Sequence, residues 1–180
     1  MFRRLALHSA FGLVISFATA APVPADDSVL ETSIFRLELP RGWNKEDGGP
    51  PLRARGPNSE VLLISVAMPA PDSNNANRMA ETQVMTDFWK ERIRKALLGA
   101  TSQQGMKTTE PFTESSMQGL PFFTAKSQND QRGSFLSCYA LIGRGGAVFI
   151  VTVEGWRKNK STAEAAVGDM FKAIVWKGKT

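Results

Sequence analysis

Histidine and cysteine are almost missing from this sequence, whose 180 residues include one of each, His8 and Cys138. His8 lies in an N-terminal segment that we expect to be removed on export, so the exported part would hold no imidazole. This absence excludes Ser-His-Asp and Cys-His catalysis, and it excludes the histidine ligands of zinc and copper sites. A single cysteine forms neither an internal disulfide nor a closed thiolate site. Because Cys138 lies in the strand-like run Phe135–Leu141, we predict a buried structural thiol.

Several short motifs of catalysis and ligand binding are also missing. No serine has a lysine three residues later, and no G-x-S-x-G sequence occurs. Asp72–Asn77 offers oxygen ligands but lacks the glycine and the terminal acid of a calcium loop. Gly143–Gly146 lies between two predicted strands, where it indicates a hairpin turn and not a phosphate-binding loop. We therefore predict no metal, no cofactor and no enzymatic activity. The alternative is an enzyme that uses carboxylates or a serine. A carboxylate mechanism needs two acids close together, and the sequence leaves open whether any two of Glu110, Glu114 and Glu154 lie close to each other.

A strong excess of charge is also absent. The formal net charge is +5, and losing Arg3 and Arg4 with the N-terminal segment would leave +3. That value is below the basic balance typical of nucleic-acid-binding domains, so we predict no nucleic-acid partner. After residue 20 no apolar run approaches the roughly 18 residues of a membrane span, and we expect none in the exported part. Weak association with the cell envelope through basic side chains stays open.

What the sequence does contain begins with the pattern of a secretory signal. Arg3 and Arg4 precede the mostly apolar segment Leu5–Phe17, and Ala18–Ala20 supplies small residues where a signal peptidase cuts. We therefore predict a signal peptide over residues 1–20, cleaved after Ala20, and a periplasmic or secreted destination. Residues 21–32, which begin with a proline-containing stretch, are predicted to be a flexible linker. Residues 33–177 are predicted to form a single domain, long enough to bury its own core.

Hydrophobic periodicity predicts the elements of that domain. Residues 34–39 alternate between apolar and charged side chains, as in a half-buried strand. Apolar residues recur every three or four positions from Ala80 until Gly99, which predicts a long helix, and the capping box Ser161–Glu164 predicts the start of a second. Further strands are predicted over residues 52–55, 61–68, 106–112, 120–127, 134–142 and 147–154, with a loop over residues 44–51. Strands joined by short turns favour an antiparallel sheet, so we predict an α+β fold in which about six or seven strands are packed by two main helices.

Four short segments share the pattern of one group of small proteins. Phe35–Trp43 matches an opening strand with an LP-x-GW turn, and Leu62–Val66 matches the strand before the first long helix. Gly119–Phe123 matches a hairpin into a central strand, and Phe171–Ile174 matches the closing helix. Together they resemble the DcrB-like and PsbP-like α/β sandwich family over most of residues 33–177. The resemblance implies a PsbP-like sandwich and a role in binding, because members include exported proteins, photosystem accessory subunits and secretion adaptors. It carries no shared catalytic motif onto this sequence.

Aromatic and basic side chains are the candidates for partner binding. Trp43 and Trp156 follow predicted strands and would be binding anchors if they were exposed, with core packing as the alternative. The basic pairs lie on the long helix and directly after Trp156, where they would suit an acidic partner or lipid headgroups; a solvated surface is the alternative. The candidate partner-binding residues are Trp43, Trp156, Lys90, Arg94, Arg157 and Lys158.

Several functions agree with this sequence. The first is an exported, non-enzymatic protein of the bacterial periplasm that binds another protein as an accessory or adaptor. The first alternative is an immunity protein that neutralises a periplasmic toxin, and the second is a small hydrolase that uses carboxylates or serine. Carriage of a ligand in an internal cavity is a further alternative. An exposed aromatic patch would favour the binding roles, whereas convergent carboxylates in a pocket would favour the hydrolase.

Overall fold

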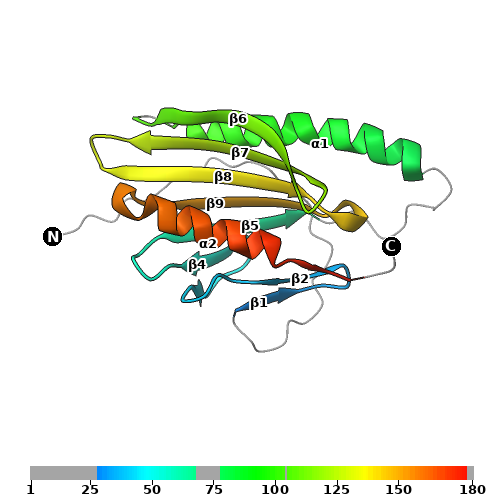
Figure 1. Cartoon of the computed structure of the whole chain (residues 1–180), viewed down its shortest axis with the longest axis horizontal. Helices are drawn as coiled ribbons and strands as arrows, with labels where there is room; N and C mark the ends of the chain where they lie inside the picture. Colours follow the sequence, from blue (N-terminus) through cyan, green and yellow to red (C-terminus); the bar gives the residue numbers. More distant parts are fainter. Residues whose placement is uncertain (1–27, 68–77, 104, 178–180) are drawn as a thin grey trace.

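The computed structural model describes residues 28–67, 78–103 and 105–177, and they form two antiparallel sheets and two long helices (Figure 1). In chain order the elements are β1 (Val29–Glu31), β2 (Phe35–Glu38), β3 (Asn44–Glu46), β4 (Leu52–Arg55), β5 (Val61–Ala67), α1 (Arg78–Thr101), β6 (Lys107–Met117), β7 (Leu120–Asn129), β8 (Ser134–Ile142), β9 (Val148–Trp156), α2 (Lys160–Lys172) and β10 (Val175–Trp176). The predicted signal peptide and the Asp72–Asn77 segment lie outside the described residues. Within the described ranges, neither helix has the length and apolarity needed to cross a bilayer.

The larger sheet has seven strands in the order β3-β4-β5-β9-β8-β7-β6, and every neighbouring pair is antiparallel. Its centre is a long ladder in which β8 pairs with β9 from Ser134↔Trp156 to Ile142↔Val148. The strands predicted over residues 120–127, 134–142 and 147–154 are all present in this sheet, as β7, β8 and β9. The predicted α+β fold with an antiparallel sheet and two main helices is therefore confirmed.

Strand β8 shows why the sheet is covered on both faces. Alternate side chains of a strand point to opposite faces, and almost all of β8 is apolar and buried. Tyr139 and Leu141 belong to the core on one face, whereas Cys138 and Ala140 belong to the core on the other. Such a strand is stable only if both faces of the sheet are covered.

Different elements cover the two faces. On one face, Val167 and Phe171 of α2 pack with Phe35 of β2, so this helix and the small sheet share one core. On the other face, Ile93 and Leu97 of α1 pack over β7 and β8. The result is a sandwich in which α1 lies on one side of the large sheet, and α2 with the small sheet lies on the other (Figure 1).

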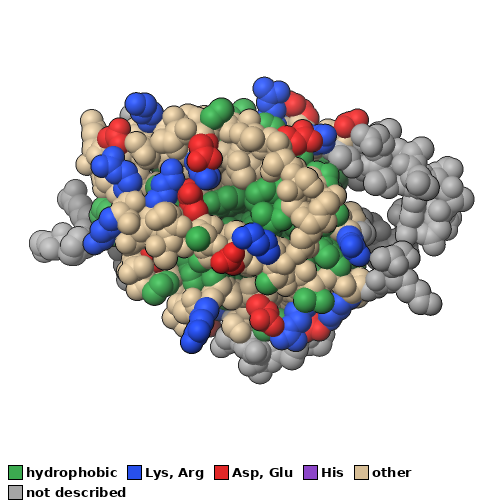
Figure 2. Space-filling model, in the orientation of Figure 1, with side chains coloured by type: hydrophobic (Ala, Val, Ile, Leu, Met, Phe, Trp, Pro, Cys, Tyr) green, Lys and Arg blue, Asp and Glu red, His purple; other side chains and the backbone are tan. Residues whose placement is uncertain are grey.

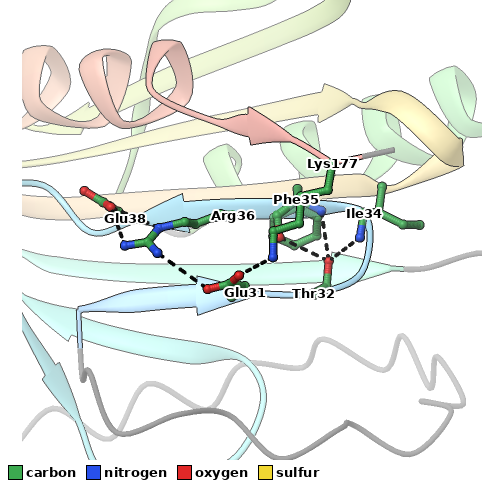
Figure 3. Close-up of polar contacts among 7 residues, drawn as sticks. All are labelled: Glu31, Thr32, Ile34, Phe35, Arg36, Glu38 and Lys177. Atoms are coloured by element: carbon green, nitrogen blue, oxygen red, sulfur yellow. Dashed lines mark hydrogen bonds and ion pairs between the residues drawn. The ribbon is translucent and has the colours of Figure 1, made fainter. Parts of the chain in front are cut away.

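The small sheet has the order β1-β2-β10 and joins the start of the described chain to its end. Its turn is held by Thr32, whose Oγ1 accepts a hydrogen bond from the Phe35 N–H at 3.1 Å. Figure 3 shows the Glu31 carboxylate between Arg36 and Lys177, with which it forms ion pairs. The hydrogen bond from Lys177, together with the charges of Lys177 and Arg36, lowers the pKa of Glu31 against a smaller opposing effect of burial.

Three short strands differ from the sequence prediction. β1 lies within residues 21–32, which were predicted to be a flexible linker, and β3 lies within the predicted loop 44–51. β10 was not predicted at all. β1 and β10 pair with β2, and β3 pairs with β4. Strands of two to three residues carry too little periodicity to be seen in a sequence, and their backbone pairing with a neighbouring strand is what stabilises them.

The structure confirms the predicted turn before β9 and corrects the predicted start of α2. The predicted hairpin at Gly143–Gly146 is present, with the Gly143 N–H donating to the Ala147 carbonyl at 2.7 Å. The predicted capping box is not present, because α2 begins at Lys160 with Asn159 as its N-cap and has no side-chain cap hydrogen bond. The side chain of Glu164 instead turns to the large sheet.

Candidate functional site

An open hollow lies where the β7–β8 turn meets the connection from β9 to α2. It has a volume of about 370 Å³ and is lined by Gly133, Trp156, Arg157 and Lys158; we call it the Trp156 hollow. Gly133 belongs to the turn, Trp156 ends β9, and the other two begin the 3-10 turn Arg157–Asn159. The Arg157 N–H donates to the Gly133 carbonyl at 2.7 Å, which fixes the two segments against each other. The position of the hollow is therefore set by the long β8–β9 ladder.

The tryptophans that were predicted as anchors differ sharply in exposure. Trp156 is 53% exposed, and among the side chains that the structure describes Val175 is the only other exposed large hydrophobic one. Trp43 is 6% exposed and packs in the core beside Gly56, so its predicted role as a surface anchor is wrong. An indole that remains this exposed gains little from the fold, and its apolar area is available to a partner.

Basic side chains surround the exposed indole. Arg157 forms an ion pair with Asp130 of the β7–β8 turn at 2.9 Å. Lys158 is exposed and forms no ion pair with any other described residue, and Arg132 is also exposed. The first turn of α2 holds no acidic residue, so no side chain there offsets the positive end of the helix dipole. The Trp156 hollow therefore combines one apolar anchor with a positive rim.

The other two basic candidates do not join this site. Lys90 and Arg94 belong to α1, which covers the opposite face of the sheet from α2. Lys90 binds Glu114 of β6 at 2.7 Å, and this hydrogen bond raises the pKa of the Lys90 ammonium group. Arg94 is exposed. Of the six candidates, the structure therefore brings together Trp156, Arg157 and Lys158.

The glutamates considered for carboxylate catalysis are directed to different partners. Glu110 binds Lys126 on the α2 side of the sheet, whereas Glu114 binds Lys90 on the α1 side. The ladder between β6 and β7 shifts register between residues 110 and 113, and this irregularity lets two glutamates of one strand face opposite ways. Glu154 lies on β9, three strands away, where burial raises its pKa against the opposing charge of Arg53. These three carboxylates do not form one site.

A polar cluster under α2 was missed by the sequence analysis. Ser137 Oγ donates to Glu164 Oε1 at 2.5 Å, and Lys126 Nζ lies 3.2 Å from Glu164 Oε2. Burial alone would lower the pKa of Lys126, but contacts with Glu110 and Glu164 outweigh it, and the pKa is raised. Ser137 is fully buried, so its hydroxyl is held as a structural group. The sequence did contain a signal, because Lys126 and Ser137 are polar residues at strand positions that face the core. Since Glu164 was interpreted as part of a capping box, these two residues were left without a partner.

Cys138 agrees with its prediction as a buried thiol. Its side chain is fully buried under α1, and burial raises the pKa of the thiol to about 12, with a further contribution from the charge of Glu154. A thiol in this state is neither a nucleophile nor a metal ligand at neutral pH.

Comparisons with known proteins identify the fold. No protein-family model and no curated protein matches the sequence. The crystal structure of LpqN, involved in cell envelope biogenesis of Mycobacterium tuberculosis, is similar with a TM-score of 0.51 and 11% identity, over 80% of this chain and 83% of that one. The cyanobacterial PsbP (CyanoP) of Synechocystis sp. PCC 6803 gives a TM-score of 0.47 and 14% identity, over 88% of this chain and 98% of that one. At such identities the likeness concerns the fold alone, and the similarity to LpqN agrees with the α+β sandwich that the sequence predicts.

Proposed function

We propose that this chain is an exported, non-enzymatic protein of the bacterial periplasm that binds another protein at the Trp156 hollow, in an accessory or adaptor role. Support for export comes from the N-terminal pattern of residues 1–20. The likeness to LpqN, a protein of cell envelope biogenesis, agrees with a place in the envelope. The binding role rests on features of the described residues alone.

One observation carries the proposal: an indole that is 53% exposed lines a hollow together with two basic side chains. Trp and Arg are the residues most enriched among the few that dominate the energy of protein interfaces. Trp156 is also held in place, because it ends a long ladder and is paired with Ser134 of β8. A rigid anchor loses little conformational entropy when a partner covers it.

The polar groups elsewhere support binding in preference to hydrolysis. A catalytic serine must reach its substrate, but Ser137 is fully buried and is bound by Glu164. The carboxylates of Glu110 and Glu164 are both held by Lys126. Two acids that are held by one lysine form a structural ion-pair network, in which their carboxylates are tied to a fixed cation.

Site-specific photo-cross-linking of the whole chain in its own cells tests this function. A photo-reactive amino acid in place of Gln131, which is exposed in the β7–β8 turn beside Gly133, should form an adduct with one partner. The same group in place of Val175, which is exposed at the far end of α2, is the matched control and should not.

Removal of the anchor completes the test. Trp156→Ala should weaken the adduct at position 131 by about thirtyfold or more, the effect of losing a central anchor worth at least ~2 kcal/mol. Val175→Ala removes the other exposed large side chain and should leave the adduct unchanged. An adduct that survives Trp156→Ala, or equal adducts at both positions, would refute the proposal. The identity of the captured protein separates an adaptor from an immunity protein, since a toxin is the partner only in the second case.

A further inference from the structure

We infer that the Trp156 hollow recognises an acidic segment of the partner protein, one in which carboxylates flank an apolar side chain. This inference rests on the proposed function and adds the chemistry of the partner. The apolar side chain would lie against the exposed indole, and the carboxylates would lie against the positive rim.

Basic side chains outnumber acidic ones around the hollow. Arg132, Arg157, Lys158 and Lys160 all lie within a few residues of its lining. Asp130 offsets one of them through its ion pair with Arg157, and Glu164 lies 3.9 Å from Lys160. Lys158 and Arg132 are left exposed to solvent. Figure 2 shows several Lys and Arg side chains at the left end of the molecule, where Figure 1 places the β7–β8 turn and the start of α2.

The backbone adds to this positive potential. The 13-residue helix α2 begins directly after the lining residues, with no acidic residue in its first turn and no side-chain cap. The helix dipole therefore favours an anion nearby. The side-chain Nδ2 of Asn159, the N-cap residue, is buried and has no hydrogen-bond acceptor within the described part of the chain.

The number of apolar anchors favours a protein segment over a lipid surface. Membrane-binding faces present several apolar side chains in one plane. Among the side chains that the structure describes, the exposed large hydrophobics are Trp156 and Val175, which lie at opposite ends of α2, about 20 Å apart along a helix of this length. Of these side chains, Trp156 is therefore the one apolar anchor at the start of α2. One indole beside a small hollow suits one side chain of a folded or extended partner.

Binding of defined probes to the isotope-labelled exported chain tests the inference. The probes are a glutamate-glycine peptide with one central phenylalanine, the same peptide with lysine in place of glutamate, and vesicles of phosphatidylglycerol. The readout is the NMR signal of the Trp156 indole N–H, assigned by comparison with Trp156→Phe. The acidic peptide should shift this signal and the lysine peptide should not. Raising the salt to about 1 M, where the Debye length is about 3 Å, should abolish the shift.

Charge reversal gives the matched control. Lys158→Glu should weaken the acidic peptide about tenfold or more, whereas Arg94→Glu, the same change on the exposed face of α1, should have no effect. The inference is overturned if the two peptides act alike, if neither shifts the signal, or if both variants respond equally. Vesicles that shift the signal when the acidic peptide does not would assign the surface to lipid. Loss of the cross-link at position 131 reports on the proposed function separately, because that test does not depend on the partner's charge.

Discussion

Removal of the Glu164 carboxylate should destabilise the fold more than any other single change to its surface charges. Glu164 accepts a hydrogen bond from Ser137 Oγ at 2.5 Å and forms an ion pair with Lys126 at 3.2 Å. Its side chain is 18% exposed and Ser137 is fully buried, so water replaces neither contact well. Glu164→Ala removes a hydrogen bond to a charged group, worth about 1.5–3 kcal/mol, and leaves a buried hydroxyl without an acceptor. Lys126 keeps its contact with Glu110. We expect a loss of about 2–4 kcal/mol in the free energy of unfolding.

Urea unfolding of the exported chain measures this loss, and a double-mutant cycle assigns it to the hydrogen bond. Glu110→Ala is the matched control; it removes a 49%-exposed carboxylate from the same lysine and should cost less than about 1 kcal/mol. Ser137→Ala should restore part of the stability lost in Glu164→Ala, because the unpaired hydroxyl is then gone. The reasoning fails if Glu164→Ala is no more costly than Glu110→Ala, or if the effects at positions 137 and 164 are additive.

Three further predictions concern the core and its titration. Gly143→Ala should lower the free energy of unfolding by roughly 1–3 kcal/mol and change tryptophan fluorescence, because a Cβ at position 143 would lie 2.6 Å from Cζ3 of Trp176. An unchanged midpoint of urea unfolding would contradict this packing. Cys138 should resist thiol reagents at pH 8 in the folded chain and react once the chain is unfolded, because burial raises its pKa to about 12; rapid labelling of the native protein would count against this burial. Glu154→Gln should stabilise the chain at neutral pH and not in acid. The pKa of Glu154 in the folded chain is raised above its ordinary 4.5 by burial, so the folded state is destabilised once the pH is high enough to ionise this carboxyl group. Glutamine carries no charge and avoids that loss. Unfolding curves at pH 7 and at about pH 3.5 check the sign, and a gain that persists at the lower pH would show another cause.

Local sequence patterns were sufficient for most of the secondary structure. Alternation and apolar runs located the strands of the large sheet, since a strand buried on one or both faces needs that spacing. The glycine-rich segment 143–146 located a hairpin, and Gly146 there has a φ of 75°, a conformation that favours glycine. Counting alone fixed the absence of histidine after residue 8, and with it the limits on catalysis.

Local patterns did not predict the short strands or the direction in which polar side chains point. β1 and β10 exist because each pairs with β2. β2 is far from β10 in the sequence, so a local pattern cannot reveal that pairing. Glu164 matched a capping box on spacing, yet its side chain binds Ser137 and Lys126, which are 27 and 38 residues away. The register shift in β6 likewise decided that Glu110 and Glu114 face opposite sides.

The sequence by itself determined the two helices and the longer strands, the order in which they occur, and the absence of histidine chemistry after residue 8. Only the tertiary structure decided which tryptophan is an anchor, because Trp43 and Trp156 have similar local settings and opposite exposures, 6% and 53%. Exposure depends on what packs against a side chain from elsewhere in the chain. Trp43 is covered by Gly56 and the core of the α2 face, whereas Trp156 ends a strand where the sandwich has no further layer.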